Sequence, residues 1–306
     1  MYWFKNAIIY RIKKELDWSN LQPRLAQEAF TPCASFDASK FGWIEPLDSE
    51  SLHHSANGFI LLVAQREEKI LPAHVINKEL KQRVDSLEEK EQRKLSKVEK
   101  QSIKDDVVAM LLQRAFSKFK QTALLIDTKQ RLIYVDAAST KQAEDVLSLL
   151  RKTLGSLPVV PLAFANNPSA LMTDWVKNDS MPDWLTLLDE AELTSTTDDA
   201  VIRCKRQDLE SEEMEQHYGA GKSITKLALY WEDHLNFVLT QDCALKRLKF
   251  ADNIREQNDD ILKEDYSQRF DADFILMTSE LSQLFDLLSN EFGVEKEIEW
   301  EIVNKN

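Results

Sequence analysis

Residues 223–250 read SITKLALYWEDHLNFVLTQDCALKRLKF, which is three short apolar segments separated by two polar stretches. The separating residues are Glu-Asp at 232–233 and Gln-Asp-Cys-Ala at 241–244. Short apolar runs joined by polar, turn-forming residues are typical of consecutive antiparallel strands. The stretch therefore predicts a three-stranded meander.

Helical patterns lie outside this meander along much of the chain. From Val75 to about Phe119 there is neither Pro nor Gly, and apolar residues recur at spacings near 3.6. This periodicity predicts one long, highly charged helix or a helical hairpin. Its alternating charges fit a solvated face or a surface for nucleic acid or a partner. Further helical segments are predicted at residues 140–155, 170–178, 183–193, 208–218 and 273–293.

Other short strands are predicted before and after the long helical stretch. The segments at 7–12 and 57–65 are strand-like, and those at 122–128 and 132–139 predict a strand pair. Pro158 and Pro161 lack amide donors, so their segment does not fit the interior of a central strand.

Charge is unevenly distributed along the 306 residues. The formal net charge of −13 disfavours nucleic-acid binding, which depends on cations that neutralise phosphates. However, residues 251–306 hold 15 acidic and 5 basic residues, whereas residues 66–120 hold 14 basic and 10 acidic ones. An acidic chain of this kind can still present a basic face.

Composition also indicates the class of protein. No run approaches 18 apolar residues and no secretory leader pattern is present, so we expect a cytoplasmic protein. Cys33, Cys204 and Cys243 are isolated in the sequence, which fits buried thiols better than disulfides or a zinc site.

Gly-Ala-Gly-Lys-Ser at 219–223 is similar to the end of a nucleotide-binding phosphate loop. The full motif needs an earlier glycine, and Gln216 stands in its place. A phosphate loop also runs from strand to helix, whereas here a predicted helix precedes the glycines. We therefore expect no nucleotide site, which leaves Lys222 and Lys226 available for phosphates of another kind.

No set of side chains specifies an active site. His53 and His54 are adjacent, so on a strand they would point to opposite faces. Asp271 and Asp273 could bind a divalent ion, but their position just ahead of a predicted helix favours capping. We expect no enzymatic activity, no metal and no cofactor.

Nine short motifs run in order over nearly the whole chain, up to about Asn290. Through them the chain resembles the family of bacterial recombination-associated RdgC proteins. The motifs are WFKN from Trp3, AFTPC from Ala29, GW from Gly42, EEKILP from Glu67, RAFSKF from Arg114, SLPVVPL from Ser156, LLDEAEL from Leu187, KRLKF from Lys246 and QRFDADFILMT from Gln268.

This resemblance implies an α+β fold in an elongated, three-part subunit. Its parts would be a central α/β part at 1–74 and 121–165, a helical tip at 75–120, and a base at 166–306 with the meander and an acidic helical C-terminus. Two subunits would join head to head and tail to tail, forming a closed ring-shaped homodimer around duplex DNA. Such a protein would bind DNA without sequence preference, restrain the RecA recombinase and associate with the nucleoid. Binding of single strands and direct contact with RecA stay open.

The resemblance also assigns individual residues. Phe116 matches a phenylalanine at one dimer junction, although its spacing from Leu112 and Phe119 also fits a core residue. Arg206 and Gln207 match a Lys-Gln pair near the other junction and the DNA path. Arginine in place of lysine keeps the charge and changes its geometry.

Further basic residues are candidates by position. Arg203 and Lys205 alternate with Cys204, so in an extended segment they would point to the same side. The residues expected to contact DNA are Arg114, Lys118, Lys120, Arg203, Lys205, Arg206, Gln207, Lys222 and Lys226, and Lys246, Arg247 and Lys249 could add cations to a sheet face.

Two other classes of function stay open. A metal-dependent DNA-processing enzyme would need convergent carboxylates, for which Asp127, Asp136, Asp271 and Asp273 are candidates. A protein-only scaffold would use the long charged helical stretch and would not bind DNA.

Overall fold

The computed structural model describes residues 3–47, 50–262 and 264–293. It is an α+β structure with two antiparallel sheets, which confirms the predicted fold class. The chain forms two compact units, unit 1 (residues 1–18, 53–61 and 123–306) and unit 2 (residues 19–52 and 62–122). The three-part division stays a prediction, and the predicted acidic end beyond residue 293 lies outside the described residues.

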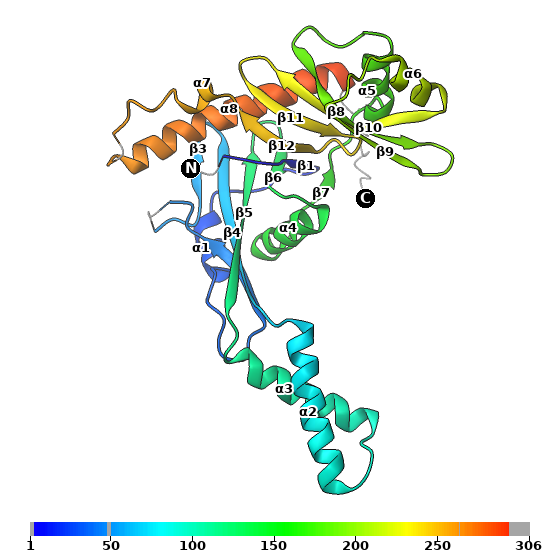
Figure 1. Cartoon of the computed structure of the whole chain (residues 1–306). Coiled ribbons are helices and arrows are strands. Elements are labelled where there is room, and N and C mark those ends of the chain that lie inside the picture. Colours follow the sequence, from blue (N-terminus) through cyan, green and yellow to red (C-terminus); the bar gives the residue numbers. More distant parts are fainter. Residues whose placement is uncertain (1–2, 48–49, 263, 294–306) are drawn as a thin grey trace, which may run out of the picture. The chain divides into compact units, whose positions relative to one another are not determined.

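A five-stranded sheet in unit 1 contains the predicted meander (Figure 1). Its strand order is β12-β11-β10-β8-β9, and every neighbouring pair is antiparallel. The strands are β8 (Leu185–Ser195), β9 (Val201–Lys205), β10 (Lys222–Trp231), β11 (Leu235–Thr240) and β12 (Leu245–Phe250).

The helix predicted at 183–193 is wrong, because this segment lies in strand β8. Leu and Glu favour helix locally, but β8 pairs with β10 on one side and β9 on the other. Its buried residues Leu185, Ala191 and Leu193 are separated by even numbers of positions, as in a strand. Tertiary pairing overrides local propensity here.

The second sheet of unit 1 contains the predicted strand pair at 122–139. Strand β6 lies between β5 and β1, and β7 pairs with β1 at the edge. The edge position of β7 agrees with Pro161 at its end and with Pro158 just before it. The strands are β1 (Ile8–Ile12), β3 (His54–Ala56), β4 (Phe59–Lys69), β5 (Ser117–Asp127), β6 (Leu132–Val135) and β7 (Val159–Pro161), of which β4 and β5 continue into unit 2.

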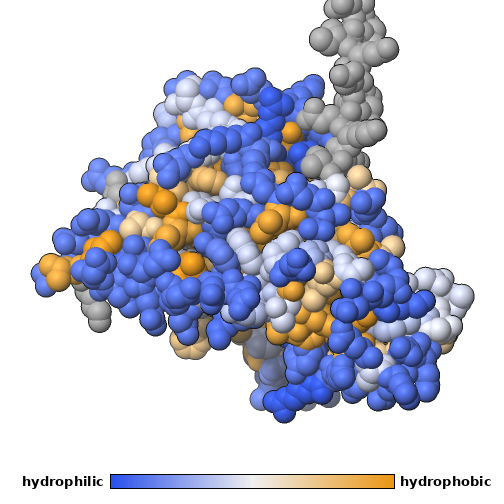
Figure 2. Space-filling view, turned by 90° about the horizontal axis from the view of Figure 1, so that it is seen from above, coloured by the Kyte–Doolittle hydropathy of each residue, from blue (hydrophilic) through white to orange (hydrophobic). Residues whose placement is uncertain are grey.

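Helices cover the sheets of unit 1. Helix α4 begins at the Ser139 cap and ends at Gly155, whose φ of 78° suits glycine. Aromatic rings of the last helix pack on other parts of unit 1. The ring of Phe292 stacks on that of Phe164, with 5.2 Å between the ring centroids. The outer surface on the side of this helix shows separate hydrophobic patches among hydrophilic residues (Figure 2). The helices are α4 (Thr140–Leu154), α5 (Pro168–Lys177), α6 (Glu212–Gly219), α7 (Asp252–Arg255) and α8 (Tyr266–Phe292).

The predicted capping role of Asp271 and Asp273 is wrong. Helix α8 begins at Tyr266, so both acids lie inside it. The residues before them, from Tyr266 to Phe270, are also helical, so the helix begins earlier in the sequence than predicted. None of the helices in the described parts of the chain is long and apolar enough to cross a membrane.

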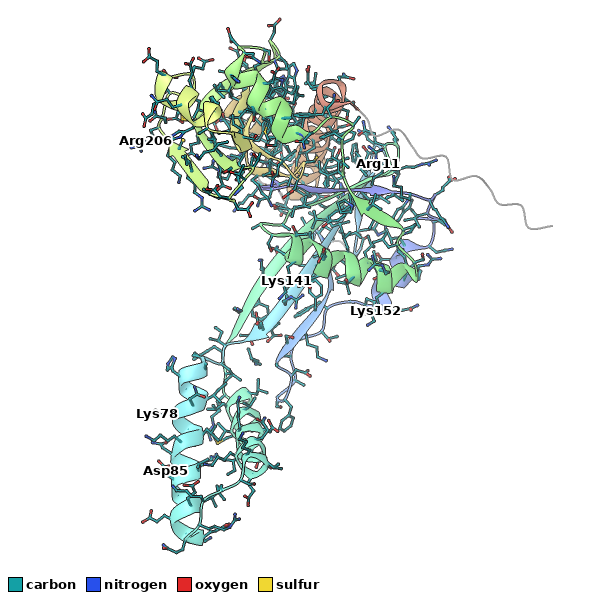
Figure 3. The ribbon with its side chains drawn as sticks, turned by 90° about the vertical axis from the view of Figure 1, so that its right-hand side faces the viewer. Arg11, Lys78, Asp85, Lys141, Lys152 and Arg206 are labelled. Carbon is teal, nitrogen blue, oxygen red and sulfur yellow. The ribbon has the colours of Figure 1, made fainter. Side chains whose placement is uncertain are left out.

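Unit 2 contains a helical hairpin, one of the two forms predicted for residues 75–119. Gln92 ends α2 in a left-handed conformation, and a capping box of Ser96 and Glu99 starts α3. Lys78 and Asp85 project from the same side of α2 (Figure 3). The helical pattern ends at Leu112 rather than Phe119, because residues 117–119 begin β5. The elements are α1 (Leu21–Gln27), β2 (Ser39–Ile44), α2 (Ala73–Glu91) and α3 (Lys97–Leu112), with the unit 2 parts of β4 and β5.

Candidate functional site

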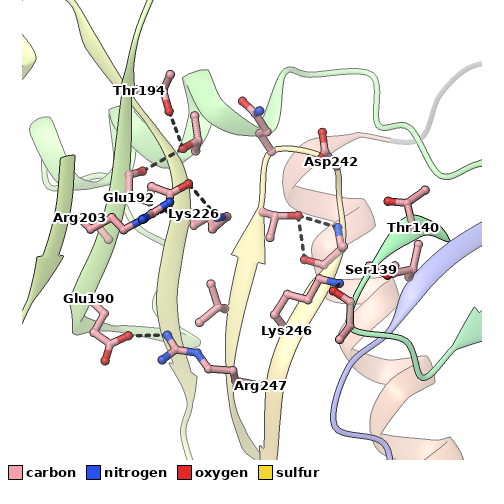
Figure 4. Close-up of a pocket in the computed structure, with 18 of the residues that line it drawn as sticks. Ser139, Thr140, Glu190, Glu192, Thr194, Arg203, Lys226, Asp242, Lys246 and Arg247 are labelled. Atoms are coloured by element: carbon pink, nitrogen blue, oxygen red, sulfur yellow. Dashed lines mark hydrogen bonds and ion pairs between the residues drawn. The ribbon is translucent and has the colours of Figure 1, made fainter. Parts of the chain in front are cut away.

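A groove of about 970 Å³ lies on one face of the five-stranded sheet in unit 1 (Figure 4). Strands β8 to β12 line one side, and β1 with the start of α4 lines the other. The two sheets meet beside it, where Ala7 and Leu245 exchange two backbone hydrogen bonds of 2.8 and 2.9 Å. The groove is therefore formed by both sheets of this unit.

Strand periodicity decides which side chains of β9 enter the groove. The Cys204 sulfur lies 3.6 Å from that of Met214 in α6, on the opposite face of the sheet. Arg203, Cys204 and Lys205 all line the groove. The alternation of the strand turns the side chains of Arg203 and Lys205 to the side away from Met214, on one side of the strand as predicted.

Two glutamates of β8 lie opposite these cations. Glu192 is paired in register with Arg203, and Glu190 with Lys205. The Glu192 carboxylate bridges two cations, since Oε2 lies 2.7 Å from Arg203 Nε and Oε1 lies 2.8 Å from Lys226 Nζ. Glu190 Oε2 lies 2.5 Å from Arg247 Nη2. These ion pairs join side chains of four strands, β8, β9, β10 and β12.

The pairing changes the acidity of both glutamates. Partial burial raises the pKa of Glu192, but the bonds from Arg203 and Lys226 outweigh it and lower the pKa below its ordinary value. The bond from Arg247 lowers the pKa of Glu190 in the same way. Both carboxylates are therefore anionic at neutral pH and offset part of the positive charge of the cations beside them.

Lys246 joins β12 to the segment before α4. Its Nζ donates hydrogen bonds of 3.2 Å to the carbonyl oxygens of Ala137 and Ala138. Burial lowers the pKa of Lys246, although Asp136 and Asp242 oppose this effect. Since carbonyls carry no net charge, these hydrogen bonds do not neutralise the charge of the lysine.

Cations outnumber acids along the groove. The charged residues that line it are five basic ones, Arg203, Lys205, Lys226, Lys246 and Arg247, and three acidic ones, Glu190, Glu192 and Asp242. The local net charge of +2 contrasts with −13 for the whole chain. Such a face attracts anions.

Three other predicted residues of unit 1 lie outside the groove lining. Arg206 follows β9 with a φ of 52° and lies at the outer part of the unit (Figure 3). The Gln207 amide donates to the carbonyl of Asp189 at 3.2 Å. Lys222 begins β10 opposite Ser195. Their predicted DNA contacts remain predictions.

The remaining predicted residues lie in unit 2, near the end of the hairpin. Phe116 is 85% exposed, so it is not the core residue that its spacing allowed. Lys118 Nζ lies 2.9 Å from a carboxylate oxygen of Glu68. Arg114 lies in the turn after α3, and Lys120 lies within β5. An exposed aromatic ring with bases around it suits a contact surface.

The four candidate catalytic acids have separate structural partners. Burial raises the pKa of Asp127 and of Asp136. Within the described residues, no group of three or more His, Cys, Asp or Glu side chains could hold a metal ion. Asp127 accepts from the amides of Lys129 and Gln130, Asp136 from those of Lys5 and Asn6, Asp271 contacts His54, and Asp273 accepts from Asn258.

Sequence reasoning missed Glu190 and Glu192. The helix predicted for 183–193 placed the two acids about 200° apart around a helix axis, roughly on opposite sides. Their separation by two positions, continued by Thr194, is the signal that assigns them to one strand face.

The fold and the groove together define an α+β protein that carries a cation-rich groove on an acidic chain. Residues 2–295 match the family model described as "Putative exonuclease, RdgC". The chain belongs to the RdgC family. It is 64% identical to the "Recombination-associated protein RdgC" of Mannheimia succiniciproducens and 62% identical to that of Pasteurella multocida, in each case over 97% of this chain and 99% of the relative. The Haemophilus influenzae relative of the same name is 58% identical over 96% of this chain and 99% of its own.

Proposed function

We propose that this chain binds duplex DNA without sequence preference, encircles it as a ring-shaped homodimer and restrains RecA-mediated recombination. The observation that carries the proposal is the groove, with five cations against three acids on a chain of net charge −13. Cations aligned on a strand face favour phosphates and read no base sequence. The name of the curated relatives, recombination-associated protein, supports a role in recombination.

The exposed ring of Phe116 supports self-association as part of this proposal. Phe116 is 85% exposed, and the exposed Ile70 lies beside it through a backbone hydrogen bond of 2.8 Å. Exposed apolar side chains that gather in one place are typical of contacts between proteins. The proposal assigns Phe116 to one contact of the homodimer and the cationic groove of each subunit to the contact with DNA. The proposal also implies association with the nucleoid.

Retention on DNA of different topology tests the proposal. The protein is bound to a closed circular duplex or to the same duplex linearised, and both are then challenged with salt. An encircling ring stays on the circle and slides off the linear ends. Equal loss from both forms contradicts encirclement, and no shift of either form at low salt favours the protein-only scaffold. Addition of the protein to a RecA strand-exchange reaction before RecA should then reduce product.

A DNA-processing enzyme is the second candidate, because the family model carries the description "Putative exonuclease, RdgC". Labelled linear duplex incubated with the protein and magnesium or manganese tests it. Cleavage that depends on the protein and is lost in an Asp127→Asn or Asp271→Asn variant would support this candidate.

A further inference from the structure

Glu190 and Glu192 are the acidic partners of the cations in the groove. Three of the five basic side chains form ion pairs with these two acids, at 2.5 to 2.8 Å. Both acids point into the groove, where Figure 4 shows their carboxylates facing Arg203, Lys226 and Arg247. An incoming anion must therefore compete with carboxylates of the protein itself.

The carboxylates present to the cations the same chemistry as a phosphodiester. Both are anionic oxygen acceptors that a guanidinium or an ammonium binds by charge-assisted hydrogen bonds. Arg203 is 73% exposed in its side chain and Lys226 is 46% exposed, whereas Glu192 is only 16% exposed. The two cations can thus turn toward a ligand, while the acid stays fixed on its strand.

Resting on the proposed function, we propose that Glu190 and Glu192 compete with the DNA backbone for the cations of the groove. This competition keeps the affinity of the protein for DNA low and the binding reversible. Phosphate competes with Glu192 for Arg203 and Lys226, and with Glu190 for Arg247, so in the unchanged protein these cations contact phosphate only part of the time. DNA bound in this way exchanges contacts readily along its length, which suits a protein that holds duplex without staying at one sequence.

Glutamine substitutions of the two acids release different numbers of cations. Glu192→Gln frees two cations and Glu190→Gln frees one, with nearly unchanged side-chain size. Each additional phosphate contact steepens the dependence of log affinity on log salt by about 0.9. We therefore expect a steeper slope by up to about 1.8 for Glu192→Gln and about 0.9 for Glu190→Gln. At low salt, Glu192→Gln should bind duplex about two- to thirtyfold more tightly.

Glu215→Gln is the matched control for net charge. Glu215 is exposed on α6, which packs on the opposite face of the sheet through Met214. Its substitution removes the same formal charge and leaves the ion pairs of the groove intact. A gain for Glu192→Gln that Glu215→Gln equals would overturn the proposal, because total charge would then explain it.

A double substitution tests the specific pairing. If Glu192 acts by occupying Arg203, the gain from Glu192→Gln shrinks when Arg203→Gln is already present. An undiminished gain in that background contradicts the role of this ion pair. Thermal unfolding of each variant shows whether the fold is kept, and Glu190→Gln provides the second variant if Glu192→Gln does not fold.

The experiment separates this inference from the proposed function. If the unchanged protein binds duplex but the glutamine variants show unaltered affinity and slope, the competitor role is wrong and the proposed function stands. If the unchanged protein and both variants fail to bind at low salt, the proposed function is wrong and the competitor role falls with it. Tighter binding in the order Glu192→Gln, Glu190→Gln, Glu215→Gln supports both.

Discussion

The amide of Ile70 donates a 2.8 Å hydrogen bond to the carbonyl of Phe116, which joins the end of β4 to the segment before β5. Both side chains are exposed, Ile70 to 46% and Phe116 to 85%. Phe119, three residues further, is 60% exposed. Unit 2 therefore presents apolar side chains at a position that its own backbone bonding fixes.

Phe116→Ala should weaken self-association of the chain. An exposed aromatic anchor at a protein contact typically contributes about 2 kcal/mol, so the dimer dissociation constant should rise about thirtyfold. Sedimentation velocity over a concentration series measures this. Val98→Ala is the control, because Val98 is 80% exposed on α3 but lies elsewhere on the hairpin. An equal effect of both substitutions would argue against a specific role for Phe116.

The meander of β10, β11 and β12 could be predicted because its turns are encoded locally. Two short polar stretches separate three apolar runs, and no distant partner is needed to see them. Helix α4 was predictable for a similar reason, since Gly155 supplies the left-handed residue that ends it.

Strand β8 could not be predicted, because its conformation depends on partners far away in the sequence. Its Leu, Asp and Glu residues have no strong strand preference, and pairing with β9 and β10 decides the outcome. The same pairing places Glu192 beside Lys226, which is 34 positions away. The cations of the groove were thus visible in the sequence, and their acidic partners were not.

The exposure of Phe116 was also undetermined by sequence. Its distance from Leu112 fits one helical face, but α3 ends at Leu112 and the chain then turns into β5. A helical spacing carries no information about burial once the helix has ended.

Lys246→Met should lower the stability of unit 1. The substitution leaves the carbonyl oxygens of Ala137 and Ala138 without the donor that each now accepts from at 3.2 Å. Because the lysine is half-buried, water can replace part of the lost hydrogen bonding. We therefore expect the free energy of unfolding to fall by about 1 kcal/mol. Urea unfolding measures it, with Lys249→Met on the exposed side of the same strand as the control. Equal midpoints for the two variants would contradict the bridging role of Lys246.

Gly42→Ala should destabilise unit 2. A Cβ atom at Gly42 would lie 2.6 Å from the backbone N and Cα of Phe30, and backbone atoms cannot move aside cheaply. Overpacking of this kind costs about 1 to 3 kcal/mol. Gly219→Ala is the matched control, because a Cβ there meets no atom within 4 Å and lies in a helix, where alanine stabilises by up to about 1 kcal/mol. Thermal unfolding should therefore shift in opposite directions for the two variants.

Acid should loosen the α2–α3 hairpin through Glu88. Bonds from Lys94, then Lys100, and from the amide of Leu95 lower the pKa of Glu88 from 4.5 to about 2. A carboxylate whose pKa is lower in the folded state stabilises that state above its unfolded pKa, and the contribution disappears as pH falls through the folded value. The hairpin should thus lose this stabilisation between pH 4.5 and about 2. Hydrogen exchange of the α2 and α3 amides across this range measures it, once each rate is divided by the intrinsic exchange rate at the same pH, and protection should decrease toward the acid end in the unchanged protein. In Glu88→Gln that loss of protection should be smaller, whereas Glu89→Gln at the exposed neighbouring position should retain it. A pH dependence that survives Glu88→Gln unchanged would assign the effect to another carboxylate.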